Sequence, residues 1–124
     1  MQGKVKILIV DDSMTIRQAI EKNLKEFQLE VVGTAGDGKT ALELFKNEDP
    51  DVVTLDITMP ELDGITVLEE MMKMKRDVKV MVITALKDKA TGLRAIQLGA
   101  KSYLVKPFTS EKLKTAFSRM MGLN

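Results

Sequence analysis

The sequence contains no cysteine, no histidine and no tryptophan, and aromatic residues make up only 4% of its 124 positions. Without cysteine, the chain can form no disulfide and can use no thiol in catalysis. Without histidine, it lacks the usual general base, any histidine-based metal site and any histidine that could carry a phosphoryl group. Carboxylates, hydroxyls and amines remain as the groups that could carry chemistry.

The chain also lacks long apolar segments and an excess of one charge. No run approaches the roughly 20 apolar residues of a membrane span, and Met1–Lys6 leads directly into a short strand pattern without the apolar core of a signal peptide. Lysine and arginine total 19 and aspartate and glutamate 18, so the net charge of +1 gives no electrostatic case for binding nucleic acid. We expect one cytoplasmic domain over residues 1–124, monomeric, that binds neither nucleic acid nor membrane.

What is present is a strict alternation of short apolar runs and helical patterns. The expected strands are 6–10, 30–35, 52–56, 79–84 and 102–106, and a helical segment follows each of them. The fourth helix, about 87–98, carries Ala90, Leu93 and Ile96 at helical spacing, and Ser110 is expected to cap the fifth. Most of the nine methionines are expected to fill the core. Such alternation predicts an α/β fold with a parallel sheet covered by helices on both faces.

Side chains able to carry chemistry stand at the ends of four of these strands. Asp11 and Asp12 follow the first, Asp56 ends the third, Thr84 the fourth and Lys106 the fifth. The carboxyl ends of parallel strands meet at one edge of the sheet, where ligands bind in open α/β folds. Two unit charges 4 Å apart repel by about 4 kcal/mol at an effective dielectric of about 20, so three carboxylates need more counter-charge than one lysine supplies. Mg²⁺, a hard cation that prefers oxygen ligands, meets this need.

Such a site is equipped for phosphoryl transfer. One carboxylate can attack phosphorus to form an aspartyl phosphate, while the metal ion and the lysine neutralise the phosphoryl oxygens. Each residue alone has an ordinary explanation, since acidic pairs start helices, threonines end strands and lysines are solvated. Their joint occurrence at four strand ends favours the phosphoryl site.

In order, spacing and strand placement, these residues resemble the receiver domain of two-component response regulators over essentially the whole chain. The matching positions are Asp11-Asp12, Asp56 with Met59-Pro60 and Asp63-Gly64, Thr84-Ala85, Gly99-Ala100 and Lys106-Pro107-Phe108. The resemblance implies a doubly wound, flavodoxin-like sheet of five parallel strands in the order 2-1-3-4-5, with five helices. Because the sequence ends after the fifth helix, it is similar to the stand-alone, CheY-like chemotaxis type.

The resemblance also assigns the site. It implies that Asp56 accepts a phosphoryl group from a phosphohistidine on a CheA-like sensor histidine kinase. Asp11, Asp56 and the backbone carbonyl of Thr58 would hold Mg²⁺, with Asp12 acting partly through water. The protein would then be a switched binding module and not an enzyme, apart from catalysing its own phosphorylation and dephosphorylation.

A switch is the second implication. Thr84 and Lys106 would bind phosphoryl oxygens, and Tyr103 matches the family's aromatic switch residue. The partner expected to dock on the fourth helix, fifth strand and fifth helix is a protein such as a flagellar motor switch, and a phosphatase is a further potential partner. The variable positions Thr58 and Leu86 are thought to tune the lifetime of the phosphoryl group. The Lys106-Pro107 bond is predicted to be cis, because Lys106 must point into the site while the chain turns into the last helix.

Three alternatives stay open. The chain could be a receiver excised from a longer regulator. A Mg²⁺-dependent phosphatase with an aspartyl nucleophile would need a second acid two residues after Asp56, where this chain has Thr58. A flavin carrier of the same topology would need a hydroxyl-rich phosphate loop in place of Asp11-Asp12, together with more aromatic residues.

Overall fold

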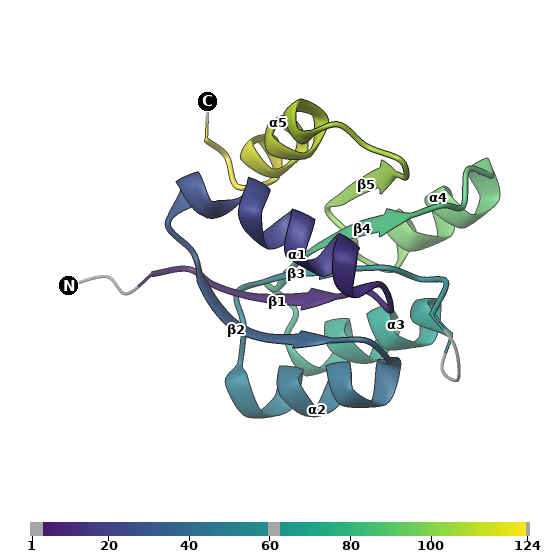
Figure 1. The fold of residues 1–124 in the computed structure, drawn as a ribbon. Coiled ribbons are helices and arrows are strands. Elements are labelled where there is room, and N and C mark those ends of the chain that lie inside the picture. The colour runs from purple at the N-terminus through teal and green to yellow at the C-terminus, as the bar shows by residue number, and fades with distance from the viewer. Residues whose placement is uncertain (1–3, 60–62, 124) are drawn as a thin grey trace.

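Residues 4–59 and 63–123 are described by the computed structural model of the chain (Figure 1). The strands are β1 (Lys6–Val10), β2 (Glu30–Ala35), β3 (Val52–Leu55), β4 (Lys79–Thr84) and β5 (Ser102–Val105). The helices are α1 (Met14–Asn23), α2 (Gly38–Glu48), α3 (Gly64–Met74), α4 (Lys89–Gln97) and α5 (Ser110–Met120), and a short 3-10 helix, η1 (Lys25–Phe27), follows α1. Pro60, part of the motif predicted after Asp56, lies outside the described residues.

The five strands form one parallel sheet in the order β2-β1-β3-β4-β5, which confirms the predicted topology. Val10 at the end of β1 pairs with Leu55 at the end of β3, so the residues that follow these two strands leave the sheet side by side. Thr84 pairs with Val105 in the same way. The register therefore brings the carboxyl ends of four strands to one edge. An irregularity between Ile7 and Leu8, which the sequence pattern did not predict, shifts the pairing of the edge strand β2.

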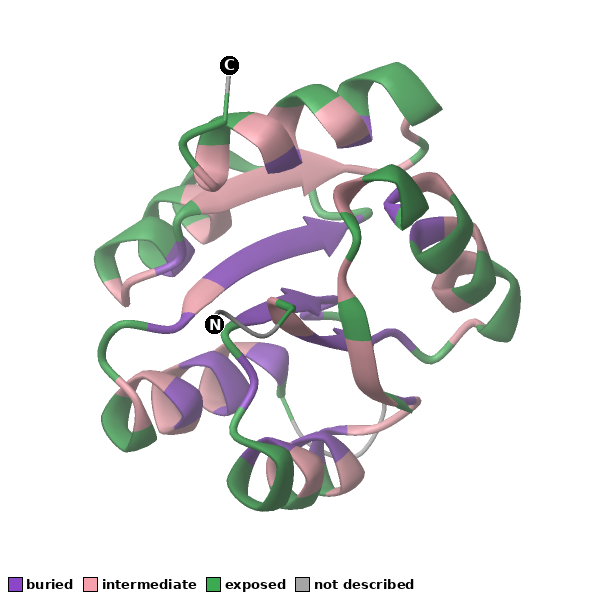
Figure 2. Ribbon diagram, turned by 90° about the vertical axis from the view of Figure 1, so that its left-hand side faces the viewer, coloured by how far each residue is buried: buried purple, intermediate pink, exposed green. Residues whose placement is uncertain are grey.

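Helices cover both faces of the sheet, with α1 and α5 on one side and α2 and α3 on the other (Figure 1). Alternate residues of each strand point to opposite faces, so two apolar cores form. The first core holds Leu8, Val53 and Val80 from the strands, together with buried residues of α2, α3 and α4. The second holds Ile7, Ile9 and Met81 with buried residues of α1 and α5, among them Ile20, Leu113 and Phe117. Figure 2 shows the result, with buried residues at the centre and exposed residues on the outer sides of the helices.

A side chain caps the start of each of the α-helices α1 to α5. The caps accept a hydrogen bond from a backbone N–H two or three residues further on, and they are Ser13, Asp37, Asp63, Asp88 and Thr109. The prediction that Ser110 caps the last helix was wrong by one residue. The Thr109 hydroxyl accepts the Lys112 N–H at 3.0 Å, whereas Ser110 is already helical and donates its hydroxyl to Asn23 Oδ1. Serine ranks slightly above threonine as a cap, so residue type alone favoured Ser110, which instead makes the contact with α1.

Helix α4 begins at Lys89, later than predicted, and turns an unexpected face inward. Leu93 is 60% exposed and Ile96 47% exposed, while Ala95 is fully buried against the sheet. The apolar spacing that predicts this helix therefore marks its outer face. The methionine prediction holds for Met59, Met71 and Met81, but Met14 and Met74 are exposed. None of the helices within the described ranges is long and apolar enough to cross a membrane.

Candidate functional site

Three carboxylates meet at the carboxyl edge of the sheet. Asp11 and Asp12 follow β1, and Asp56 follows the neighbouring strand β3. One carboxylate oxygen from each residue lies within 4.8 Å of the others. Asp11 and Asp56 are buried, whereas Asp12 is exposed and opens the cluster to solvent. The structure thus brings together all three acidic residues that the sequence predicted for the metal site.

Lys106 is the positive charge of this cluster. Its Nζ lies 2.7 Å from Asp11 Oδ2 and donates a hydrogen bond to Asp56 Oδ2 at 2.9 Å. The contact with Asp11 is a close ion pair, and the two carboxylates together hold the pKa of Lys106 above its ordinary value. The Lys106-Pro107 bond is cis, as predicted. Lys106 therefore bridges the two buried carboxylates.

Asp56 is held at both of its carboxylate oxygens. Oδ1 accepts the backbone N–H of Thr58 at 2.9 Å and its hydroxyl at 2.7 Å, while Oδ2 accepts Lys106. Burial alone would raise the pKa of Asp56, but the hydrogen bonds from Thr58 and Lys106 together lower it below its ordinary value. Asp56 therefore stays ionised, as a nucleophile must. The hydroxyl contact of Thr58 was not predicted, because the sequence reasoning gave Thr58 a metal-binding carbonyl and an effect on phosphoryl lifetime but no bond to Asp56.

Asp11 has the opposite electrostatic character. Burial raises its pKa, and this effect outweighs the lowering caused by Lys106 and by the Ser13 N–H, which donates to Asp11 Oδ1 at 2.9 Å. A buried carboxylate whose ionised form is disfavoured gains from a cation beside it. The donor set consists of oxygens only, the choice of Mg²⁺ and Ca²⁺ in proteins, so the residues fit a hard divalent ion.

Gly64, at the start of α3, keeps the segment after Asp56 in place. An alanine Cβ at this position would lie 2.1 Å from the Cα of Ile57, which is closer than any real contact. Only glycine lets the first turn of α3 approach the backbone between Asp56 and Thr58. This close approach is the physical reason for the glycine in the Asp63-Gly64 motif.

The two predicted switch residues lie on the neighbouring strands β4 and β5. Thr84 ends β4, the neighbour of β3, and is fully buried, and its hydroxyl oxygen accepts the N–H of Leu86 at 3.4 Å. The hydroxyl of Tyr103, on β5, donates to the carbonyl oxygen of Leu86 at 3.0 Å. The structure therefore connects both switch residues to one residue of the β4–α4 loop.

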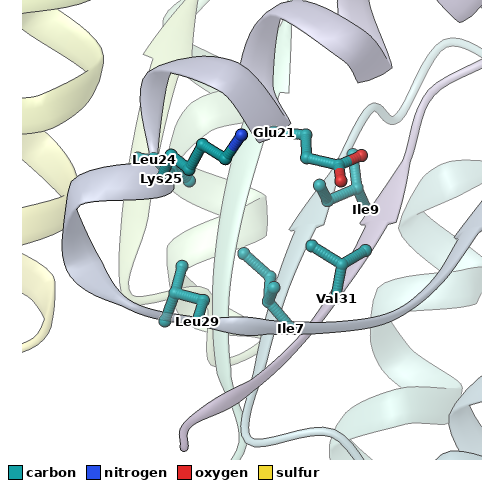
Figure 3. Close-up of a pocket in the computed structure, with 7 residues that line it drawn as sticks. All are labelled: Ile7, Ile9, Glu21, Leu24, Lys25, Leu29 and Val31. Carbon is teal, nitrogen blue, oxygen red and sulfur yellow. The ribbon is translucent and has the colours of Figure 1, made fainter.

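A separate cavity of about 320 Å³ is lined by residues of β1, α1, η1 and β2 (Figure 3). Most of the lining side chains are apolar, and Glu21 and Lys25 lie on the side formed by the helices. The lining residues are Ile7, Ile9, Glu21, Leu24, Lys25, Leu29 and Val31. The acidic cluster contributes no residue to it. The cavity therefore belongs to the apolar packing under α1 and not to the candidate site.

The doubly wound parallel sheet in the order β2-β1-β3-β4-β5 defines the class of the protein as a flavodoxin-like α/β domain, and an acidic cluster with a lysine lies at the carboxyl edge of its sheet. The profile of the response regulator receiver domain matches residues 7–118. The chain belongs to the response regulator receiver domain family.

Particular relatives come from two groups of regulators. The chain is 39% identical to "Chemotaxis protein CheY" of Bacillus subtilis, over 94% of this chain and 98% of the relative. It is 42% identical to "Probable transcriptional regulator ycf27" of Cyanophora paradoxa, over 96% of this chain but only 49% of the relative. It thus spans about half the length of that regulator. Among solved structures, the CheY in a complex with CheX, beryllofluoride and magnesium from Borrelia burgdorferi matches with a TM-score of 0.88 and 33% identity, over 94% of this chain and 88% of that one.

Proposed function

We propose that this protein is a phosphorylation-activated response regulator of a two-component system, in which Asp56 accepts a phosphoryl group from the phosphohistidine of a sensor histidine kinase. The observation that carries the proposal is the environment of Asp56. It is a buried carboxylate kept ionised by Thr58 and Lys106, 2.9 Å from the lysine and within 4.8 Å of two further carboxylates. Family membership over residues 7–118 supports the same role and a cytoplasmic place of action.

The residues have distinct tasks in this reaction. An oxygen of Asp56 forms the new bond to phosphorus while the bond from phosphorus to the histidine nitrogen breaks, and that nitrogen keeps the electron pair. Lys106, already at Asp56 Oδ2, shifts its ammonium group to a phosphoryl oxygen as the carboxylate loses its charge. The hydroxyl of Thr84 donates to another phosphoryl oxygen. In this role the protein catalyses its own phosphorylation and dephosphorylation and does not act as an enzyme on an external substrate.

Asp11, Asp12 and Asp56, with the backbone carbonyl of Thr58, are the proposed ligands of Mg²⁺. When bound there, the ion would supply positive charge that stabilises the transferring phosphoryl group. The three carboxylates within 4.8 Å of one another and the raised pKa of the buried Asp11 support this assignment. The magnesium and beryllofluoride named for the Borrelia relative support it by similarity.

We further propose that the output is the docking of a protein partner, in chemotaxis. Coverage of 98% of the Bacillus CheY supports this output. A second candidate is a receiver that controls transcription from within a longer protein. The match to about half of the ycf27 regulator is the observation that supports it. Capture of a flagellar motor component by the phosphorylated form alone supports chemotaxis, and its failure to bind such a component favours the second candidate.

Acetyl phosphate with Mg²⁺ provides the direct test of the phosphoryl site. Intact-mass spectrometry should show one added phosphoryl group on the wild type, none on Asp56→Asn and far less on Lys106→Ala. Asp77→Asn serves as the control and should react like the wild type. Asp77 is exposed and precedes β4, at the amino-terminal ends of the strands and so opposite to the acidic cluster. Equal uptake by Asp56→Asn would show that the acceptor is another residue.

A further inference from the structure

Arg17 on α1 is a charged residue with a contact that the proposed chemistry does not use. Its Nη1 donates a hydrogen bond to the backbone carbonyl oxygen of Asp11 at 2.5 Å. The N–H of Asp11 donates in turn to the Ala35 carbonyl of β2 at 2.9 Å. The backbone of Asp11 is therefore held on one side by the sheet and on the other by a guanidinium group from the helix.

The carbonyl that Arg17 holds belongs to the peptide unit between Asp11 and Asp12. The orientation of this unit sets the direction in which the Asp12 side chain leaves the backbone. Packing does not hold Asp12, since it is exposed, although its carboxylate must stay within 4.8 Å of Asp11 and Asp56 to complete the cluster. The contact from Arg17 is thus placed where it fixes the least constrained of the three acids.

Gly36, just after β2, leaves the space through which Arg17 reaches this carbonyl. An alanine Cβ at this position would lie 3.1 Å from Arg17 Nη1 and 3.9 Å from the carbonyl oxygen of Asp11. The guanidinium is the far end of a flexible side chain, so it would move away before the backbone did. Gly36 and Arg17 therefore act on the same contact from two elements of the fold.

We propose that Arg17 is a positioning residue for the metal site, which holds the Asp11–Asp12 peptide so that the three carboxylates stay within reach of one divalent cation. The inference rests on the proposed function, because it takes the acidic cluster as a Mg²⁺ site. It predicts an effect opposite to that of simple electrostatics. Removal of a positive charge beside an acidic cluster should strengthen cation binding, whereas loss of the positioning contact should weaken it.

The test is a titration of the protein with MgCl₂ alone, followed by the amide NMR signals of Asp12 and Thr58 and by the melting temperature. Arg17→Ala should bind Mg²⁺ about tenfold more weakly than the wild type, the lower end of the range for residues that orient metal ligands. Lys22→Ala is the matched control, because it removes the same charge from an exposed position on the same helix, and its affinity should be unchanged or slightly higher. Urea unfolding of the same variants without Mg²⁺ shows whether a weaker response to Mg²⁺ reflects weaker binding or a general loss of stability.

Gly36→Ala provides a second variant that keeps the arginine. It should weaken Mg²⁺ binding in the same direction, and adding it to Arg17→Ala should cause little further loss, because both changes remove one contact. A wild type that does not respond to Mg²⁺ would overturn the metal site and the role of Arg17 with it. A wild type that binds, with Arg17→Ala binding equally well or more tightly, would overturn the role of Arg17 alone. Equal losses from Gly36→Ala with and without Arg17 would overturn the claim that Gly36 acts through the Arg17 contact.

Discussion

Thr84 and Tyr103 hydrogen-bond to opposite ends of one residue, Leu86. The Thr84 hydroxyl oxygen accepts the Leu86 N–H at 3.4 Å, and the Tyr103 hydroxyl donates to the Leu86 carbonyl at 3.0 Å. A movement of Thr84 toward a phosphoryl group on Asp56 would break its hydrogen bond to the Leu86 N–H. Leu86 could then shift, and Tyr103 would lose the carbonyl oxygen to which it donates. The family resemblance predicts that position 86 affects the lifetime of the phosphoryl group. Through these two hydrogen bonds, Leu86 also connects Thr84 at the candidate site with Tyr103 on β5.

The first prediction follows from this link. Beryllofluoride with Mg²⁺ should move the amide NMR signals of Thr84, Leu86 and Tyr103 together in the wild type. A charge-assisted hydrogen bond from Thr84 supplies about 1.5–3 kcal/mol, enough to shift a two-state equilibrium about ten- to hundredfold. In Thr84→Ala the Tyr103 signals should stay in place although beryllofluoride still binds. Tyr103→Phe is the control, in which Thr84 should still respond, and a full Tyr103 shift in Thr84→Ala would rule out this link.

The second prediction concerns the pH dependence of Lys106. Burial lowers the pKa of Lys106, but Asp11 and Asp56 outweigh this effect and hold it above the ordinary value of 10.5. Because the pKa of Lys106 is higher in the folded than in the unfolded protein, its charged form stabilises the fold. This stabilisation is complete below about pH 10.5 and is lost as the pH rises through the folded-state pKa. On the acid side, the lowered pKa of Asp56 means that the stabilisation is lost as the pH falls below 3.8, its ordinary pKa, toward the folded value.

Urea unfolding of the wild type and Lys106→Met over this pH range tests the expectation. The difference in unfolding free energy should form a plateau of about 3 kcal/mol at neutral pH, the lower end of the range for removing one partner of a buried pair, since Lys106 stays 18% exposed. The plateau should fall off at both ends. Lys114→Met removes an exposed ion pair with Glu26 and should cost under about 1 kcal/mol. A difference that does not change up to strongly alkaline pH would contradict the assigned pKa direction.

The third prediction concerns Thr54, in the middle of β3. Its side chain is fully buried between Ile9 and Met81, and its hydroxyl has no hydrogen-bond partner in the parts of the chain that the structure describes. An unpaired buried hydroxyl costs about 1–3 kcal/mol, so Thr54→Val should stabilise the protein by about 1–2 kcal/mol in urea unfolding. The reverse change on the same strand, Val52→Thr, should destabilise it by a similar amount. A loss of stability in Thr54→Val would indicate that the hydroxyl does find a partner.

The fourth prediction contrasts two glycines at which the same substitution has opposite effects. Gly92→Ala, inside α4, meets the Tyr103 ring at an ordinary 3.8 Å and should stabilise the protein by about 0.5–1 kcal/mol through helix propensity. Gly64→Ala collides with the Ile57 backbone and should cost about 2–3 kcal/mol. Because Ile57 adjoins Asp56, Gly64→Ala should also slow phosphoryl uptake from acetyl phosphate. Melting curves and intact mass measure the two effects, and a neutral Gly64→Ala would contradict the close approach.

The chain's own pattern determined the parts of this protein that depend on local chemistry and on the sheet geometry. The alternation of strands and helices implied a parallel sheet, and the polar residues that end the strands could then only meet at one edge. This reasoning brought Asp11, Asp56 and Lys106 together correctly, because a strand end is recognisable in the sequence and parallel strands align their ends. The strand order came from the family resemblance, which the structure confirms.

Tertiary structure decided the contacts made between elements. The outer face of α4 has the same apolar spacing as a buried face, so only packing against the sheet shows that Ala95 is inside and Leu93 outside. Serine is by type the slightly better cap, yet Thr109 caps α5 and Ser110 contacts Asn23 of α1. The bond from Arg17 to Asp11 and the space left by Gly36 join three elements that are separate in sequence. Periodicity specifies which residues share a face, but not which face meets the sheet or which side chain reaches a neighbouring loop, because those depend on distances that exist only after the elements have packed.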